Sequence, residues 1–177
     1  TTDAAVNKAT PGLFAAFPTP QAMAAASEAD IAKHISKLGL YRNKAKFLKK
    51  CAQQLLDNFD GQVPQTREEL ESLAGVGRKT ANVIRGNIFH EPSVVVDTHV
   101  KRISKKLGLT KEDDPEKVEY ELMKVLPKDH WILYNIQIIT LGRTICKAPT
   151  PKCMECFLTE WCKDYQNRQK KEIRKKK

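Results

Sequence analysis

The sequence lacks a long apolar run. None of its 177 residues belong to a stretch approaching the roughly 18 consecutive apolar residues that a membrane-spanning helix needs. No leader of charged, then apolar, then small residues opens the chain. The 41% hydrophobic content is nevertheless enough for a packed core. These features predict a soluble, intracellular protein without a membrane partner.

Acidic residues are fewer than basic ones. The chain has 31 Lys and Arg against 21 Asp and Glu, which gives a formal net charge of +10 at pH 7. An excess of this size favours a polyanionic partner. Because no strongly amphipathic basic helix stands out, nucleic acid is a better candidate than an anionic membrane.

Patterns typical of β-strands are also rare. The apolar run 94–96 has no alternation, so it predicts a buried linker. The run HWILYNIQIITLG, residues 130–142, predicts a helix buried on most sides. Residues that commonly start helices recur along the chain, at Thr19, Ser27, Thr66, Asp97 and Asp114. The sequence therefore predicts an all-α protein.

A glycine-flanked turn joins two of the predicted helices. The sequence LAGVGRKTANVI, residues 73–84, places Gly75 and Gly77 on either side of Val76. Such a tight turn needs residues that tolerate positive φ and the close approach of another group. Apolar spacing predicts a second helix from about Arg78, whose first amides point back at the turn. An amide-lined turn of this kind predicts an anion-binding site.

Lys79 is difficult to explain as scaffold. It falls in the first turn of the second helix, where the helix dipole and the unpaired amides disfavour a cation. The same positive field favours the neutral amine, which is the form that acts as a nucleophile. A contact with a phosphate would also account for a lysine at this position. The position alone leaves the catalytic and the phosphate-binding role open.

Asp97 directly precedes another predicted helix. Aspartate is a preferred N-cap residue, which is a sufficient structural reason for its presence. A carboxylate held at a helix start is also rigid, as a general base or a charge stabiliser must be. The two roles are compatible. His99, two residues later, is expected to be satisfied by protein groups or to face a phosphate.

Four of the five cysteines lie close together, in the pattern C-x6-C-x2-C-x5-C. In an intracellular protein this clustering argues against disulfides, and four thiolates can enclose a tetrahedral metal or an iron–sulfur cluster. Zinc sites more often present two C-x2-C pairs, so the irregular spacing favours a [4Fe-4S] cluster, with structural zinc as the alternative. The expected ligands are Cys146, Cys153, Cys156 and Cys162, whereas Cys51 is expected in the core.

Basic residues accompany the cysteines. The loop KAPTPK between the first two ligands is stiffened by two prolines and offers Lys147 and Lys152 to phosphates, although solvated charge is the simpler interpretation. The final segment NRQKKEIRKKK, residues 167–177, has little to bury. We therefore expect a disordered tail that adds nonspecific, salt-sensitive affinity for nucleic acid.

Three motifs together resemble one protein family. LAGVGRKTANVI, VVVDTH (residues 94–99) and the four-cysteine pattern, in this order and at these separations, resemble the endonuclease III family of DNA glycosylases with AP-lyase activity. The resemblance extends from Thr1 to about Cys162. It implies an all-α helix-hairpin-helix fold with two helical lobes, one of which carries a C-terminal iron–sulfur loop. A damaged base would be flipped into a pocket between the lobes.

The resemblance also implies roles for individual residues. Lys79 matches the family's catalytic lysine, Asp97 its catalytic aspartate, and the four cysteines its cluster ligands. By this resemblance Lys79 attacks C1′ of the flipped nucleotide, Asp97 stabilises the developing positive charge, and β-elimination follows from a Schiff base. Expected DNA contacts are Gly75, Val76, Gly77, Arg78, Lys147 and Lys152.

The resemblance further implies a partner and a division of the chain. The partner is double-stranded DNA with a damaged base or an abasic site, oxidised pyrimidines are the implied substrates, and the protein is expected to act as a monomer in the bacterial cytoplasm, at the nucleoid. We expect a first lobe over 1–109 with the hairpin at about 66–89, a cysteine module over 110–166, and the tail over 167–177.

Two departures from the family pattern stand out. Ala74 occupies a position where the family usually has proline, which is expected to loosen the hairpin. The family also has further helices before the equivalent of Thr1, including one that helps to cover the cluster lobe and a glutamine that fills the gap left by the flipped base. Those segments are not in this sequence.

Two alternatives to the bifunctional enzyme remain open at the level of sequence. The first is a non-catalytic hairpin module that binds DNA by shape, with the metal site as a structural clip. The second is a monofunctional glycosylase that acts on a mismatched or deaminated base. Lys79 together with Asp97 distinguishes the enzyme from a pure DNA binder.

Overall fold

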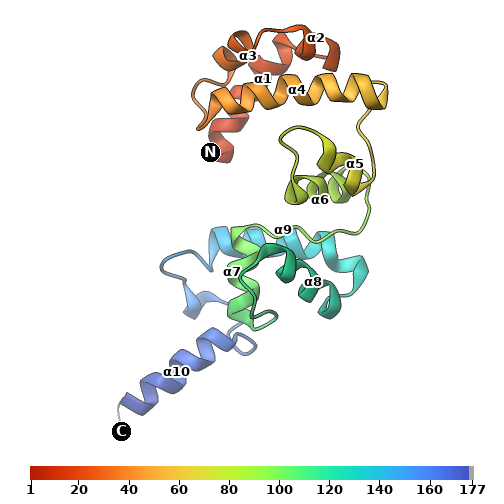
Figure 1. The fold of residues 1–177 in the computed structure, drawn as a ribbon. Helices are drawn as coiled ribbons and strands as arrows, with labels where there is room; N and C mark the ends of the chain where they lie inside the picture. The colour runs from red at the N-terminus through yellow and green to blue at the C-terminus, as the bar shows by residue number, and fades with distance from the viewer. Residues whose placement is uncertain (176–177) are drawn as a thin grey trace. The chain divides into compact units, whose positions relative to one another are not determined.

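The computed structural model describes residues 1–175, which form helices and connecting loops and contain no strand (Figure 1). The α-helices are α1 (Asp3–Ala16), α2 (Pro20–Ala25), α3 (Glu28–His34), α4 (Tyr41–Phe59), α5 (Arg67–Ser72), α6 (Arg78–Asn87), α7 (Thr98–Leu107), α8 (Pro115–Val125), α9 (Trp131–Thr144) and α10 (Lys163–Lys175). Two short 3-10 helices are η1 (Lys128–His130) and η2 (Cys153–Glu155). The predicted all-α fold is confirmed. No helix in this part of the chain is both long and apolar enough to cross a membrane.

The helix starts follow the capping signals in the sequence. At each predicted start a side-chain oxygen accepts a hydrogen bond from a backbone N–H of the first turn, which satisfies one of the amides that the helix leaves unpaired. Thr66 and Glu69 form the complete capping box. Thr2 caps α1 in the same way, although the sequence did not single it out. The predicted caps that act in this way are Thr19, Ser27, Thr66, Asp97 and Asp114.

The chain divides into two compact units, residues 1–81 and 82–177. The boundary falls inside α6, whereas the sequence placed a division after residue 109. The difference has a physical cause, because residues of α7 share one core with α8 and α9. That shared core assigns α7 to the second unit.

In the first unit α4 packs against α2 and α3. Ala45 and Ala52 on α4 are buried, and such small side chains allow neighbouring helices to approach closely. Ile31 of α3 is completely buried in the same cluster. This packing makes α4 the central element of the unit, and the hairpin described below is attached to it.

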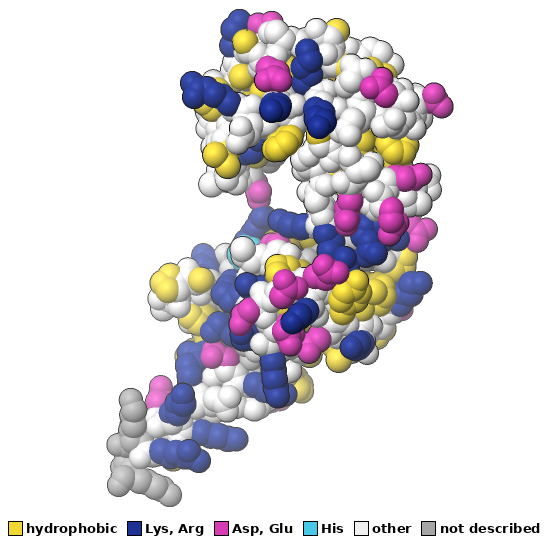
Figure 2. Space-filling model, viewed as in Figure 1, with side chains coloured by type: hydrophobic (Ala, Val, Ile, Leu, Met, Phe, Trp, Pro, Cys, Tyr) yellow, Lys and Arg dark blue, Asp and Glu magenta, His cyan; other side chains and the backbone are white. Residues whose placement is uncertain are grey.

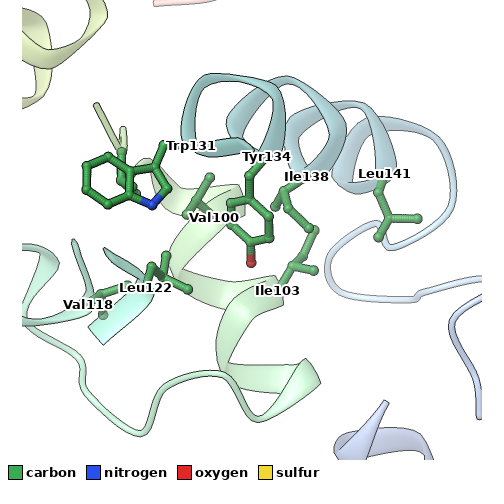
Figure 3. Packing of buried hydrophobic residues seen from close by; sticks show 9 residues of the cluster. Val100, Ile103, Val118, Leu122, Trp131, Tyr134, Ile138 and Leu141 are labelled. Carbon is green, nitrogen blue, oxygen red and sulfur yellow. The ribbon is translucent and has the colours of Figure 1, made fainter. Parts of the chain in front are cut away.

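In the second unit one hydrophobic core joins three helices (Figure 3). Ile103 of α7 and Leu122 of α8 are almost completely buried against α9. The hydroxyl group of Tyr134 on α9 lies 2.7 Å from that of Ser104 on α7, which satisfies two polar groups inside the core. Burial raises the pKa of Tyr134, so the phenol stays protonated there.

Helix α9 is buried on one face only. Leu133 and Ile136 are 45% and 55% exposed, while Ile138 and Leu141 are buried. The prediction that this helix is buried on most sides is therefore wrong. Its apolar composition gives little distinction between faces, so the sequence pattern could not show that the packing partner α7 covers only one of them.

The basic C-terminal segment is helical as far as the structure describes it. The sequence predicted disorder from residue 167, but α10 continues to Lys175. Asp164 anchors the first turn, because its carboxylate pairs with Lys106 of α7 at 2.9 Å and with Arg168 at 3.1 Å. These pairs account for a helix in a segment that buries little apolar surface. Residues 176 and 177 of the predicted tail lie outside the described residues.

Candidate functional site

The glycine-flanked turn between α5 and α6 has the predicted geometry at Gly75 but not at Gly77, which has no positive φ and where an added Cβ would meet nothing within 4 Å. Gly75 has φ +79°, a left-handed conformation that favours glycine. A Cβ atom at this position would lie 3.0 Å from Cβ of Phe47 on α4, so space as well as conformation requires glycine. The Gly77 carbonyl accepts the N–H of Ala81 at 3.0 Å and starts α6. The first amides of α6 therefore lie next to an exposed turn.

A glutamine from α4 connects that helix to the turn. Gln54 Oε1 accepts the backbone N–H of Ala74 at 2.7 Å, and Gln54 Nε2 donates to the carbonyl of Ser72 at 3.2 Å. The absence of proline at residue 74 was expected to loosen the hairpin. The structure shows instead that the N–H which proline would lack is hydrogen-bonded. The sequence gave no signal for this contact, because the two residues are 20 positions apart.

Lys79 is the second residue of α6 and is exposed. The first turn of this helix contains no acidic residue. The residue therefore lies at the positive end of the helix dipole, without a carboxylate in the same turn. The neighbouring Arg78 and Val76 are half-buried, while Gly77 is exposed.

Asp97, in the second unit, is held rigidly at the start of α7. Its Oδ1 atom accepts the backbone N–H of Val100 at 2.7 Å, and its carbonyl accepts the N–H of Lys101 at 2.9 Å. The carboxylate is half-buried. The predicted capping role is confirmed, and this geometry also gives the carboxylate a fixed direction.

The linker that leads to Asp97 is tethered to α6 by residues that the sequence analysis missed. Asn82 Nδ2 donates to the carbonyl of Val94 at 3.1 Å, and Ser93 Oγ donates to the carbonyl of Asn82 at 2.8 Å. All three residues are buried. A Cβ atom at Gly86 would lie 2.8 Å from Ser93 Oγ, so glycine permits the close approach. Asparagine is unfavourable inside helices, and its presence in α6 could have indicated such a contact.

Protein groups contact the ring of His99, which agrees with the first of its two expected roles. Its Nδ1 atom lies 3.3 Å from Arg102 Nη2, and the ring is half-buried against Gly142 of α9. An added Cβ at Gly142 would come within 2.4 Å of the ring nitrogen. This close contact makes the histidine part of the packing between α7 and α9.

The four clustered cysteines line one cavity in the second unit. Cys146 follows α9, Cys153 begins η2, Cys156 directly follows η2, and Cys162 precedes α10. The sequence brings them together because the intervening loop closes on itself, through a 2.9 Å bond from the Lys152 N–H to the Ile145 carbonyl. Within the described residues no group of three or more His, Cys, Asp or Glu is arranged to hold a single metal ion. The thiols surround a space and do not converge on one point.

Two guanidinium groups lie next to this cavity. Arg168 Nη2 lies 3.1 Å from Cys153 Sγ, and Arg102 Nη1 donates to the Cys146 carbonyl at 2.7 Å with Cys146 Sγ at 3.7 Å. The hydrogen bond to Cys153 raises the pKa of Arg168. Burial raises the pKa of the Cys146 thiol, and the charge of Arg102 opposes that rise. At Cys146 burial outweighs the cation, so the thiol form is favoured there in the absence of a metal.

The remaining sequence-predicted contacts lie on the loop before η2. Lys147 and Lys152 are both exposed. Lys152 Nζ lies 3.3 Å from Glu155 Oε2, so part of its charge is used within the protein. Cys51 was expected in the core, but it is only half-buried on α4 and does not belong to the core cluster of the first unit; this partial burial raises its pKa.

The arrangement of helices, hairpin and cysteine module defines a class of protein. Residues 1–128 match the model of the HhH-GPD superfamily of base excision DNA repair proteins. The chain is 46% identical over 162 residues to endonuclease III of Synechocystis sp., covering 91% of this chain and 74% of that protein. It is 42% identical over 176 residues to endonuclease III of Bacillus subtilis, covering 99% of this chain and 80% of that protein.

A similar solved structure indicates the same family as these relatives. It is that of a trapped endonuclease III–DNA covalent intermediate in an estranged-adenine complex, with a TM-score of 0.90 and 43% sequence identity, covering 95% of this chain and 79% of that chain. The chain belongs to the endonuclease III family. It is a DNA glycosylase and AP lyase of base excision repair.

Proposed function

We propose that this enzyme removes oxidised pyrimidines from double-stranded DNA and cuts the strand 3′ to the abasic site through a Schiff base on Lys79. The observation that carries the proposal is the position of Lys79, an exposed amine at the start of α6 directly after the glycine turn. A nucleophile next to backbone amides that can hold a phosphate is positioned for chemistry on a nucleotide. The similar structure, by its description, is a covalent intermediate with DNA.

The proposed chemistry uses two side chains. The neutral amine of Lys79 attacks C1′ of the nucleotide, and the bond from C1′ to the base breaks as the base leaves with the bonding electrons. The carboxylate of Asp97 stabilises the positive charge that develops on the sugar. One of the two protons on the attacking nitrogen passes to the departing base, and the other passes to O4′ as the C1′–O4′ bond breaks and the ring opens, which leaves a C1′=N imine. The imine acidifies the 2′ position, and removal of a 2′ proton expels the 3′ phosphate by β-elimination.

The cysteine module fits a [4Fe-4S] cluster. Cys146, Cys153, Cys156 and Cys162 line one cavity, and their irregular C-x6-C-x2-C-x5-C spacing favours a multi-iron cluster over a single zinc ion. Bound there, the cluster would supply structural cross-linking of the loop 147–152. The protein's own groups orient that loop and shield the thiolates, because Arg102 and Arg168 lie beside two of the sulfurs. Lys147 would then be held where it can contact a DNA phosphate.

The DNA contacts that we propose are the hairpin residues Gly75, Val76, Gly77 and Arg78 in the first unit and, separately, Lys147 and Lys152 in the second unit. The turn would supply backbone N–H groups to a phosphate, since a glycine-rich turn at a helix start lets the phosphate approach closely. The protein would act on this DNA as a monomer. The binding energy would come mainly from phosphates and would therefore depend on salt.

Borohydride trapping tests the proposed function. Duplex DNA with a single abasic site or a single oxidised pyrimidine is incubated with the protein and reduced, and the covalent adduct is resolved on a denaturing gel. We expect an adduct with the native protein, none with Lys79→Gln, and an unchanged adduct with the control Lys8→Gln, which removes an exposed lysine of α1. Absence of an adduct from folded, cluster-containing native protein would refute the Schiff-base mechanism.

Two other outcomes would identify the alternative functions. Base release without strand cleavage, from a duplex with a mismatched or deaminated base, would indicate a monofunctional glycosylase. DNA binding without base release from any defined lesion would indicate a non-catalytic module. A series of duplexes that each carry one defined lesion, compared by single-turnover cleavage, measures the proposed preference for oxidised pyrimidines directly.

A further inference from the structure

An open basic groove lies in the second unit, along α7 and the start of α10. It has a volume of about 660 Å³. Asp97 caps the N-terminal end of α7, whereas the groove extends to the C-terminal end of that helix and the loop beyond it. None of the residues assigned above to catalysis or lesion binding line it. Its basic side chains are Lys101, Arg102, Lys105, Lys106, Lys111 and Lys163.

The positive charge of the groove exceeds what its own structure uses. Two carboxylates line it, and they pair with Lys105 at 2.6 Å and with Lys106 at 2.9 Å. The negative end of the α7 dipole also favours these two lysines, which lie in the last turn. Both effects together explain Lys105 and Lys106 as ordinary features of a helix C-terminus. They leave the other lysines unexplained.

Three lysines from separate segments converge on this groove. Lys101 comes from α7, Lys111 from the following loop and Lys163 from the first residue of α10. Lys101 and Lys163 donate to backbone carbonyls, of Asp113 at 3.0 Å and of Gly108 at 3.5 Å. Neither of these bonds neutralises the ammonium charge, although Lys101 contributes, after Lys105, to lowering the pKa of the Asp113 carboxyl. Like charges brought together in this way repel one another, so their convergence favours a bound polyanion.

The basic surface continues beyond the groove along α10. In Figure 2 Lys and Arg side chains, in dark blue, project from this helix at the lower left. The helix has 13 residues, which corresponds to about 20 Å. Exposed basic residues on it are Arg168, Lys170, Lys171 and Arg174. A small anion would use only one part of such a surface, whereas a nucleic acid backbone carries charge along its whole length.

We propose that the groove and α10 form a second contact surface for the phosphate backbone of duplex DNA, separate from the lesion-binding residues. The surface binds DNA of any sequence. It holds the undamaged duplex beside a lesion, and it also holds undamaged DNA while the enzyme searches for a lesion. The identity of the partner as DNA rests on the proposed function, whereas the polyanion site rests on the groove itself. An open groove lined by solvated lysines suits phosphate contacts, because these position DNA without reading bases.

Salt-dependent binding to an undamaged duplex tests this proposal. The groove variant carries Lys101→Gln, Lys111→Gln and Lys163→Gln. The control variant carries Lys117→Gln, Lys124→Gln and Lys128→Gln, which removes the same charge from exposed residues of the second unit outside the groove. The slope of log Kobs against log salt should decrease by about two to three for the groove variant and by less than about one for the control.

The result can be separated from the lesion chemistry. Trapping at saturating abasic-site DNA should be equal in the native, groove and control proteins, because the groove holds no reacting group. If trapping failed in all three proteins, the measurement on the undamaged duplex would still show whether the groove binds DNA. A variant with arginine at the three groove positions retains the charge, so recovery of the native slope excludes misfolding as the cause. Equal slopes for groove and control variants would overturn the proposal, as would preferential competition by single-stranded RNA or anionic lipid vesicles.

Discussion

The backbone N–H of Ala74 donates a hydrogen bond of 2.7 Å to Oε1 of Gln54. The amide nitrogen of the same side chain donates to the carbonyl of Ser72, so one glutamine of α4 bonds to the hairpin on two sides of Leu73. Proline, which the resemblance to the family leads us to expect at residue 74, has no N–H to donate. With alanine at this position, the hydrogen bond to Gln54 connects the turn to α4.

Replacement of this glutamine should weaken the hairpin. In Gln54→Leu the Ala74 N–H loses its acceptor, and we expect the free energy of unfolding to fall by about 1 kcal/mol and the affinity for duplex DNA to fall severalfold. Urea unfolding and duplex binding measure the two effects. Gln53→Leu is the matched control, because Gln53 is the exposed neighbour that bonds within α4 to Asp57.

A double-mutant cycle shows whether the Ala74 N–H carries the effect. Ala74→Pro removes the donor, so Gln54→Leu should cost less in the Ala74→Pro background than alone, by about 0.5–1 kcal/mol. Strictly additive costs would contradict the assigned hydrogen bond.

Substitutions of Asp97 should separate its capping role from its proposed catalytic role. Asparagine caps helices about as well as aspartate, so Asp97→Asn should keep the stability within about 0.5 kcal/mol and yet slow base excision by at least about tenfold. Asp97→Ala should slow excision and also cost about 1 kcal/mol of stability. Thermal unfolding and single-turnover excision distinguish the two. Native excision rates in Asp97→Asn would show that the residue is only a cap.

Cysteine substitutions should identify the cofactor. Cys153→Ser removes a ligand, and we expect loss of the broad visible absorption and of bound iron, with lower stability. Cys51→Ser should retain both, because Cys51 lies on α4 and does not line the cysteine cavity. Iron and sulfide analysis together with absorption spectra provide the measurement. A colourless native protein with one equivalent of zinc would establish the alternative cofactor.

Arg168 should affect the properties of the cluster without being a ligand. Its guanidinium lies 3.1 Å from Cys153 Sγ, and hydrogen bonds and positive charge at a ligand sulfur stabilise the reduced cluster. Arg168→Gln should therefore lower the reduction potential and hasten loss of the cluster in air. Protein-film voltammetry measures the shift, with Lys170→Gln as the control for charge alone. Equal potentials in both variants would show that the contact has no effect on the cluster.

Truncations of two leucines should confirm which surfaces form the core of the second unit. Leu122 is completely buried between helices, so Leu122→Ala should cost about 2–5 kcal/mol of unfolding free energy. Leu133 on α9 is 45% exposed, and Leu133→Ala should cost less than about 1 kcal/mol. Denaturant unfolding compares them. A large cost at Leu133 would show that this face of α9 is covered in solution.

Local signals predicted much of the fold. Each cap from Thr19 to Asp114 and the left-handed Gly75 follow from interactions within a few residues, which a single sequence contains. Contacts between distant segments were missed, including the bond from Gln54 to Ala74 and the tether from Asn82 to Val94. The helical structure of α10 was missed for the same reason, because the carboxylate of Asp164 accepts a hydrogen bond from Lys106, which lies 58 residues away.

The hydrogen bond from Val100 to Asp97 fixes the direction of the carboxylate. Oδ1 accepts one backbone N–H of α7 and keeps a further lone pair, and the second oxygen is an acceptor as well. The cap therefore sets the line along which a partner must approach, and the side chain does not have to reorient when one arrives.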